Sequence, residues 1–144
     1  MTWLHCKDER GSAAIEAVVG VPAFALLVGL IIFGGRTATT HSAIESAAAD
    51  AARTASIART ATQAKQDATA AAQASLANQN IRCLSVTVSV GVSDFSKTVG
   101  QAGSVSATVE CLLDLGDLSV PGVPGSRIIK ATSSSPLDTW RERG

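Results

Sequence analysis

The fold is decided by residues 10–36, which read RGSAAIEAVVGVPAFALLVGLIIFGGR. From Ala17 to Gly35 the stretch holds 19 uncharged residues, rich in Val, Leu, Ile, Phe, Gly and Ala. A bilayer core about 30 Å thick needs about 20 helical residues to cross it. The stretch therefore predicts one transmembrane helix, with the acid Glu16 at its N-terminal edge and Pro22 inside it.

The residues around the span leave three interpretations of it open. A secretory signal peptide normally has an apolar region of about 7–15 residues, followed by small residues at a cleavage site. Here the apolar run is longer, and Arg36 follows it. A plain signal anchor would cross the membrane without processing. A prepilin-type leader would instead be cut after Gly11 and would leave Ser12 as the first mature residue.

The order of residues in this stretch resembles that of the TadE-like pseudopilins of tight-adherence pilus systems. The resemblance rests on Arg10–Glu16, on Val18–Pro22 and on the Leu- and Ile-rich run that ends Phe33–Arg36. It implies that a prepilin peptidase cleaves after Gly11, which makes Glu16 the fifth mature residue. Pilins usually begin with Phe or Met, whereas TadE-like sequences tolerate a small first residue, as in this chain.

The resemblance also implies a role for Glu16 in assembly, because in pilins this acid pairs with the terminal amine of a neighbouring subunit. An amine at Ser12 would lie about 6 Å from Glu16 along a helix. Opposite charges attract each other more strongly in a medium of low dielectric constant. The simpler interpretation, in which Glu16 is solvated among lipid headgroups, stays open.

The basic residues that flank the span indicate its orientation only weakly. Lys7 and Arg10 precede it and Arg36 follows it, and an excess of positive charge favours the cytoplasmic side. The resemblance implies the same orientation. We therefore expect a single-pass protein of the cytoplasmic membrane, with its N-terminus inside, its C-terminal head outside and a place in a cell-surface pilus.

The composition of the chain argues against several classes of function. Twelve basic and 12 acidic residues give a formal charge of zero, whereas a nucleic-acid-binding protein needs a basic face. Aromatic residues make up 3% of the chain, which leaves few platforms for stacking against bases or sugars. The two histidines, His5 and His41, lie on opposite sides of the span, and Asp114 and Asp117 suit an exposed turn. We expect no catalytic residues, no metal, no cofactor, no nucleic acid and no small-molecule substrate.

Residues 37–79 are dense in Ala and contain neither Gly nor Pro, which favours a helix. Apolar residues recur there every three or four positions, as on one face of a helix: Ile44, Ala48, Ala51, Ala55 and Ala58. The sequence therefore predicts one helix from about residue 12 to about residue 77, which would be about 100 Å long. The small side chains allow this helix to pack closely either on other helices or on the chain's own strands.

After Asn80 the helical periodicity gives way to alternation. Apolar and polar residues alternate over 84–92 and again over 105–111, and residues 93–103 between them contain turn formers. A third short strand is expected over Arg127–Thr132. These patterns predict an α+β fold, in which a small antiparallel three-stranded sheet covers the apolar side of the long helix.

Two cysteines outside the leader, Cys83 and Cys111, indicate a disulfide, since the head is expected in an oxidising compartment. Closing this loop would stabilise the head by about 3–4 kcal/mol. The alternation places Cys83 with the polar residues and Cys111 with the apolar ones. A register that pairs Leu84 with Val109 leaves the cysteines offset by one residue, so we expect a β-bulge near residues 82–84.

These elements divide the chain into five parts. They are a leader (1–11), a transmembrane helix (12–35), an Ala-rich helix (36–79), a β head (80–134) and an irregular tail (135–144). The resemblance implies a minor pseudopilin that helps to build a pilus, and implies as partners a prepilin peptidase, an assembly platform and other pilin-like subunits. The alternative is a membrane-anchored binding or sensor protein without prepilin processing.

Overall fold

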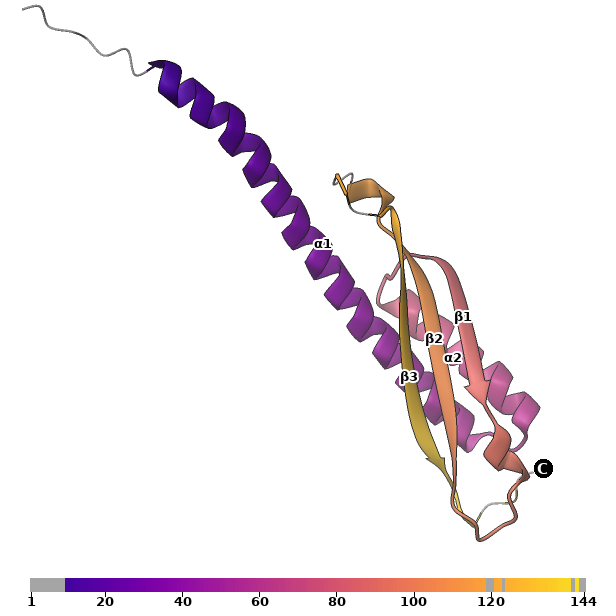
Figure 1. Ribbon diagram of the computed structural model, residues 1–144. Helices are drawn as coiled ribbons and strands as arrows, with labels where there is room; N and C mark the ends of the chain where they lie inside the picture. The colour runs from indigo at the N-terminus through magenta and orange to yellow at the C-terminus, as the bar shows by residue number, and fades with distance from the viewer. Residues whose placement is uncertain (1–9, 119–120, 123, 141, 143–144) are drawn as a thin grey trace, which may run out of the picture.

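The computed structural model describes residues 10–118, 121–122, 124–140 and 142. A long helix extends away from a small head, in which a second helix and a sheet pack against its C-terminal half (Figure 1). The head contains three antiparallel strands in the order β1-β2-β3. The predicted α+β class, with a long N-terminal helix and a small three-stranded sheet, is confirmed. The helices and strands are α1 Arg10–Ile57, α2 Ala61–Asn78, β1 Cys83–Gly91, β2 Gly103–Asp114 and β3 Ser126–Leu137.

The prediction of one uninterrupted helix to residue 77 is wrong, because the chain reverses between Ile57 and Ala61. Thr60 takes an extended backbone conformation there, and its side chain accepts a hydrogen bond from the backbone N–H of Gln63 at 3.1 Å. This is an N-cap, which satisfies one of the free donors at the start of a helix. The cap starts α2, which then runs back along α1 (Figure 1).

The end of α2 is fixed by a second local motif. Asn80 adopts a left-handed conformation with φ of 54°. Its N–H bonds to the carbonyl of Ala77 at 3.0 Å, and the N–H of Ile81 bonds to the carbonyl of Leu76 at 3.2 Å. This pattern is a Schellman motif, in which Asn is one of the few residues that tolerates the left-handed position. The helix end predicted at about residue 77 is confirmed.

The core lies between the two helices and one face of the sheet. On α1 the predicted apolar stripe is buried and is wider than expected, since Ala47 and Ala52 are buried as well. On α2 every fourth residue is buried from Ala64 to Leu76. The chain's own α2 and strands cover these alanines. The buried residues of the sheet are Val105, Ala107, Val109, Cys111, Leu113, Ile129, Ala131 and Leu137.

The register between β1 and β2 differs from the predicted one. Val88, not Leu84, lies opposite Val109. The connection between the strands is held from inside, because Phe95 is buried and the carboxylate of Asp94 accepts a hydrogen bond from the N–H of Ser104 at 2.9 Å. Leu84 lies on the outer surface and is 59% exposed.

The third strand is longer than predicted. β3 continues past Thr132 to Leu137 and pairs with β2 along its whole length, from Asp114 opposite Ser126 to Gly103 opposite Leu137. The irregular tail expected from residue 135 therefore begins three residues later. Its backbone is tied to the β1–β2 connection, since the N–H of Gly100 donates to the carbonyl of Thr139 at 2.8 Å.

Candidate functional site

The N-terminal part of α1 exposes a long apolar surface. The helix continues through Pro22 as one α-helix. Within the described residues it is the one helix long and apolar enough to cross a membrane. No residue of its most apolar segment is buried by the rest of the protein. Exposed patches of this size mark contact with a membrane or with other proteins. The large apolar side chains exposed on this part of α1 are Ile15, Val18, Val19, Val21, Phe24, Leu26, Leu27, Leu30, Ile31 and Ile32.

The predicted processing and assembly residues all lie at the start of this helix. Gly11 and Ser12 are in the first turn of α1, and the side chain of Ser12 lies outside the described residues. Glu16 follows one turn later with an exposed side chain. Cleavage after Gly11 and pairing of Glu16 with a neighbouring amine stay predictions.

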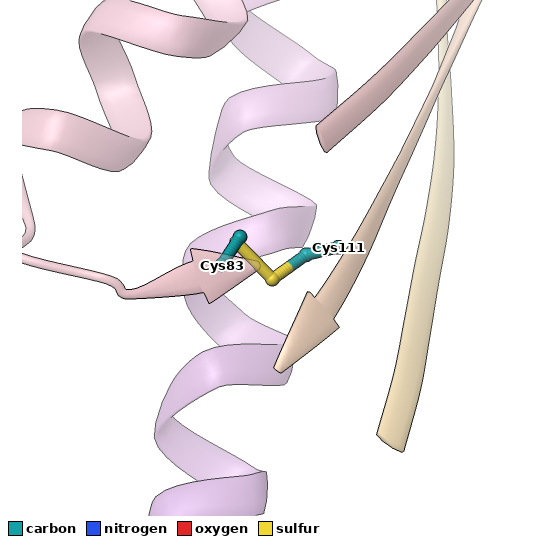
Figure 2. Close-up of a disulfide and its surroundings, with 2 residues drawn as sticks. All are labelled: Cys83 and Cys111. Carbon is teal, nitrogen blue, oxygen red and sulfur yellow. A yellow bond between two sulfur atoms is a disulfide. The ribbon is translucent and has the colours of Figure 1, made fainter. Parts of the chain in front are cut away.

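The predicted disulfide between Cys83 and Cys111 is confirmed, with Cα atoms 5.5 Å apart. Figure 2 shows the bond joining the start of β1 to β2, in front of the long helix. The expected bulge is also confirmed, since the register shifts between Cys83 and Ser85. The shift places Cys83 opposite Leu113, on the buried face that also holds Cys111, and so removes the mismatch in alternation.

An ion pair connects the end of the apolar part of α1 to the segment that follows β2. A short 3-10 helix, η2 (Gly116–Leu118), follows β2. One guanidinium nitrogen of Arg36 donates to both carboxylate oxygens of Asp117, each at 2.8 Å. These hydrogen bonds, together with the positive charge of Arg36, lower the pKa of Asp117 below its ordinary value. The pair links the residue that ends the apolar run to the loop after β2.

A groove of about 620 Å³ lies beside this ion pair. α1 contributes Arg36 and Thr40 to its walls, the connection between α2 and β1 contributes Arg82, and the end of β2 contributes Asp114. Asp114 accepts a hydrogen bond from the N–H of Gly116 at 3.0 Å. Positively and negatively charged side chains therefore both line the groove. It lies where α1 enters the head, immediately after the apolar run, and this region is called the base of the head.

Other titratable side chains form simple surface contacts. His41 lies 3.4 Å from Glu45, one turn further along α1. Lys130 and Glu110 form an ion pair across the outer face of the sheet, at 2.6 Å. Among the described residues, no three His, Cys, Asp or Glu side chains gather in a way that could hold a metal ion. His5 lies outside the described residues.

The sequence did not reveal the groove or the contact between Arg36 and Asp117. These two residues are 81 positions apart, and their meeting depends on how the sheet is placed on the helices. Arg36 was recognised as the end of the apolar run, and Asp114 and Asp117 as residues of an exposed turn. No local pattern joined them.

Comparison with known proteins adds one finding. No curated protein and no solved structure matches the chain. Residues 11–53 match the family model described as TadE-like protein, which agrees with the resemblance to this family in residues 10–36.

Proposed function

We propose that this protein is a TadE-like minor pseudopilin, a membrane-anchored structural subunit used in assembling a tight-adherence type pilus. The observation that carries the proposal is the family match over residues 11–53. The match covers the segment in which an exposed apolar helix passes into the buried alanine face of the head. A helix that leaves its apolar half uncovered fits a subunit whose anchor lies in lipid or against similar helices.

Processing follows from the same proposal. A prepilin peptidase cleaves after Gly11, and the new amine of Ser12 neutralises Glu16 of a neighbouring subunit. The exposed position of Glu16 on α1 supports this role, because its carboxylate is open to a second chain. An unpaired carboxylate inside a bilayer is energetically unfavourable, and a partner amine would reduce that cost by neutralising the charge.

The orientation places the short N-terminus in the cytoplasm and the head outside. The bond between Cys83 and Cys111 supports this orientation, because disulfides persist in oxidising compartments and are rare in the cytoplasm. The basic Lys7 and Arg10 before the span agree with it. In this topology the partners are the prepilin peptidase, the assembly platform and other pilin-like subunits.

Mass spectrometry of the protein isolated from its native membrane tests processing. We expect the mature chain to begin at Ser12, and to keep its leader when Gly11 is replaced by Leu. An intact N-terminus at Met1 in cells with an active prepilin peptidase would contradict the proposal. It would favour the anchored binding or sensor protein instead, for which the groove at the base of the head is the candidate site.

Assembly is tested separately with Glu16→Gln, which removes the charge and keeps the size of the side chain. We expect this variant to insert in the membrane and to be processed, but to be lost from the assembled pilus. Glu45→Gln is the matched control, since Glu45 is an exposed acid of the same helix within the head. Normal incorporation of Glu16→Gln would contradict the assembly role of this residue.

A further inference from the structure

The groove at the base of the head lies at the height where a membrane surface would be. Arg36, in its wall, is the first charged residue after the apolar run. In a single-pass anchor the hydrocarbon core ends with that run, and the headgroup layer begins directly beyond it. The groove therefore opens at the level of the lipid headgroups whenever α1 crosses a bilayer, which is the anchoring part of the function proposed above.

The charges in the groove do not all satisfy each other. Arg36 and Asp117 form the ion pair described above. Among the described residues, neither Arg82 nor Asp114 has an ion-pair partner, and the two do not pair with each other. The carboxylate of Asp114 accepts one backbone hydrogen bond, from Gly116. The charge of Arg82 contributes to the lowered pKa of Asp117 without forming an ion pair with it, so the groove offers one guanidinium and, apart from it, one carboxylate that have no ion-pair partner among the described residues.

A buried hydroxyl adds a third polar group. Thr40 is 4% exposed and is the buried polar side chain of the described core, and it lines the groove. The neighbouring Thr37 and Thr39 donate to helix carbonyls one turn back. The Thr40 hydroxyl makes no such bond within the part of the chain that the structure describes. A buried polar group without a partner is unfavourable, so a ligand that supplied one would be stabilised.

These groups select for a ligand that carries both charges. A phosphate suits Arg82, because guanidinium groups donate charge-assisted hydrogen bonds to phosphate oxygens. A primary ammonium suits Asp114, since it donates N–H bonds that a quaternary ammonium lacks. A volume of about 620 Å³ lies within the range of small-molecule sites. We propose that the groove binds the headgroup of a phospholipid that joins a phosphate to a primary ammonium, as in phosphatidylethanolamine.

The test uses the full-length protein in nanodiscs of phosphatidylcholine that contain a minor share of either phosphatidylethanolamine or phosphatidylglycerol. Native mass spectrometry then counts the lipids that stay bound. We expect phosphatidylethanolamine to be enriched over both other lipids by about tenfold, the effect of one or two charge-assisted hydrogen bonds. Equal retention of the three lipids would overturn the proposal. So would a preference for phosphatidylglycerol, which would mean that phosphate alone is recognised.

Two variants and two controls assign the groups. Arg82→Gln and Asp114→Asn should each abolish the enrichment, and Asn can still accept the bond from Gly116. Arg59→Gln and Asp67→Asn change the same charges far from the groove and should leave the enrichment unchanged. Full enrichment in either groove variant would overturn the assignment. Formation of the bond between the cysteines, measured by intact mass, checks that every variant has folded.

The anchor and the lipid site fail in different ways. If the protein floats with phosphatidylcholine vesicles but shows no lipid preference, only the lipid site is overturned. If it does not float with vesicles at all, the anchor is overturned together with the site. Soluble glycerophosphoethanolamine carries the same headgroup without acyl chains, so it distinguishes a lipid in the membrane from a free compound in solution as the ligand. Saturation of the groove by the soluble compound at the concentration at which the lipid saturates it would overturn the membrane source.

Discussion

Arg36 and Asp117 join the end of the apolar run to η2 through two hydrogen bonds of 2.8 Å from a single guanidinium nitrogen. The two side chains are 47% and 61% exposed. Exposed ion pairs of this kind contribute little to stability, because water and salt screen them. The pair therefore contributes little to the stability of the head, and it joins η2 to α1 at the base of the head.

The pKa of Asp117 tests this contact directly. The Arg36 guanidinium lowers the pKa of Asp117 below 3.8, so the contribution of the pair to stability is present above that pH and is lost as the pH falls through the lowered pKa. Titration of the Asp117 carboxyl by NMR should give a midpoint that rises in Arg36→Gln. Arg59→Gln is the control and should leave it unchanged. An equal midpoint in wild type and Arg36→Gln would mean that the pair does not form in solution.

Loss of the disulfide should weaken the head. Replacing Cys83 and Cys111 together by Ser opens a loop of sequence separation 28. We expect the free energy of unfolding to fall by about 3–4 kcal/mol, because the unfolded chain gains conformational freedom. Denaturant unfolding of the head, followed by circular dichroism, measures this loss. In the chain that keeps its leader, Cys6→Ser removes a thiol outside the bond and should unfold as wild type does.

Loss of the Thr60 cap should lower the stability of the head more than loss of the nearby Thr62 side chain. Thr60→Ala removes the hydrogen bond to the N–H of Gln63 and should lower the free energy of unfolding by about 1 kcal/mol. Thr62→Ala is the matched control, because Thr62 is exposed inside α2, where Ala is the better helix former. Thermal unfolding distinguishes the two. Equal stability of both variants would show that this cap does not hold the reversal.

The packing of α2 on α1 predicts a position-dependent effect of enlarging alanines. Ala68 is fully buried, and Ala70, two residues later, is exposed. Ala68→Leu should destabilise the head by about 1–3 kcal/mol, since extra methylenes do not fit a packed interface. Ala70→Leu should change the stability little. Similar stabilities in denaturant would indicate an uninterrupted helix whose alanines all face solvent.

The sequence predicted the elements whose signal is local. Alternating valines placed β1 and β2, and the compartment of Cys83 and Cys111 indicated their bond. The mismatch in alternation even located the bulge, because a side chain must change face to reach its partner. The segment before Arg36 was equally clear, since length and lack of charge suffice to identify a possible span.

Other features escaped prediction because they depend on tertiary contacts. The reversal at Thr60 interrupts helix-forming sequence on both sides by only a few residues, and propensity alone does not reveal it. The available signal was Thr60 followed three positions later by Gln63, the spacing of a capping box. The serines at the end of β3 carry little strand preference, yet pairing with β2 keeps them extended.

The return of α2 along α1 has a steric consequence for any fibre. From Arg10 to Ile32 α1 stands alone as a single helix, whereas in the head a second helix and a sheet pack beside it. Touching helices have axes only about 8–10 Å apart. If the single-helix parts of two neighbouring subunits touched without a shift along the helix axis, their heads would overlap. Closely packed copies must therefore be shifted relative to each other along the helix axis.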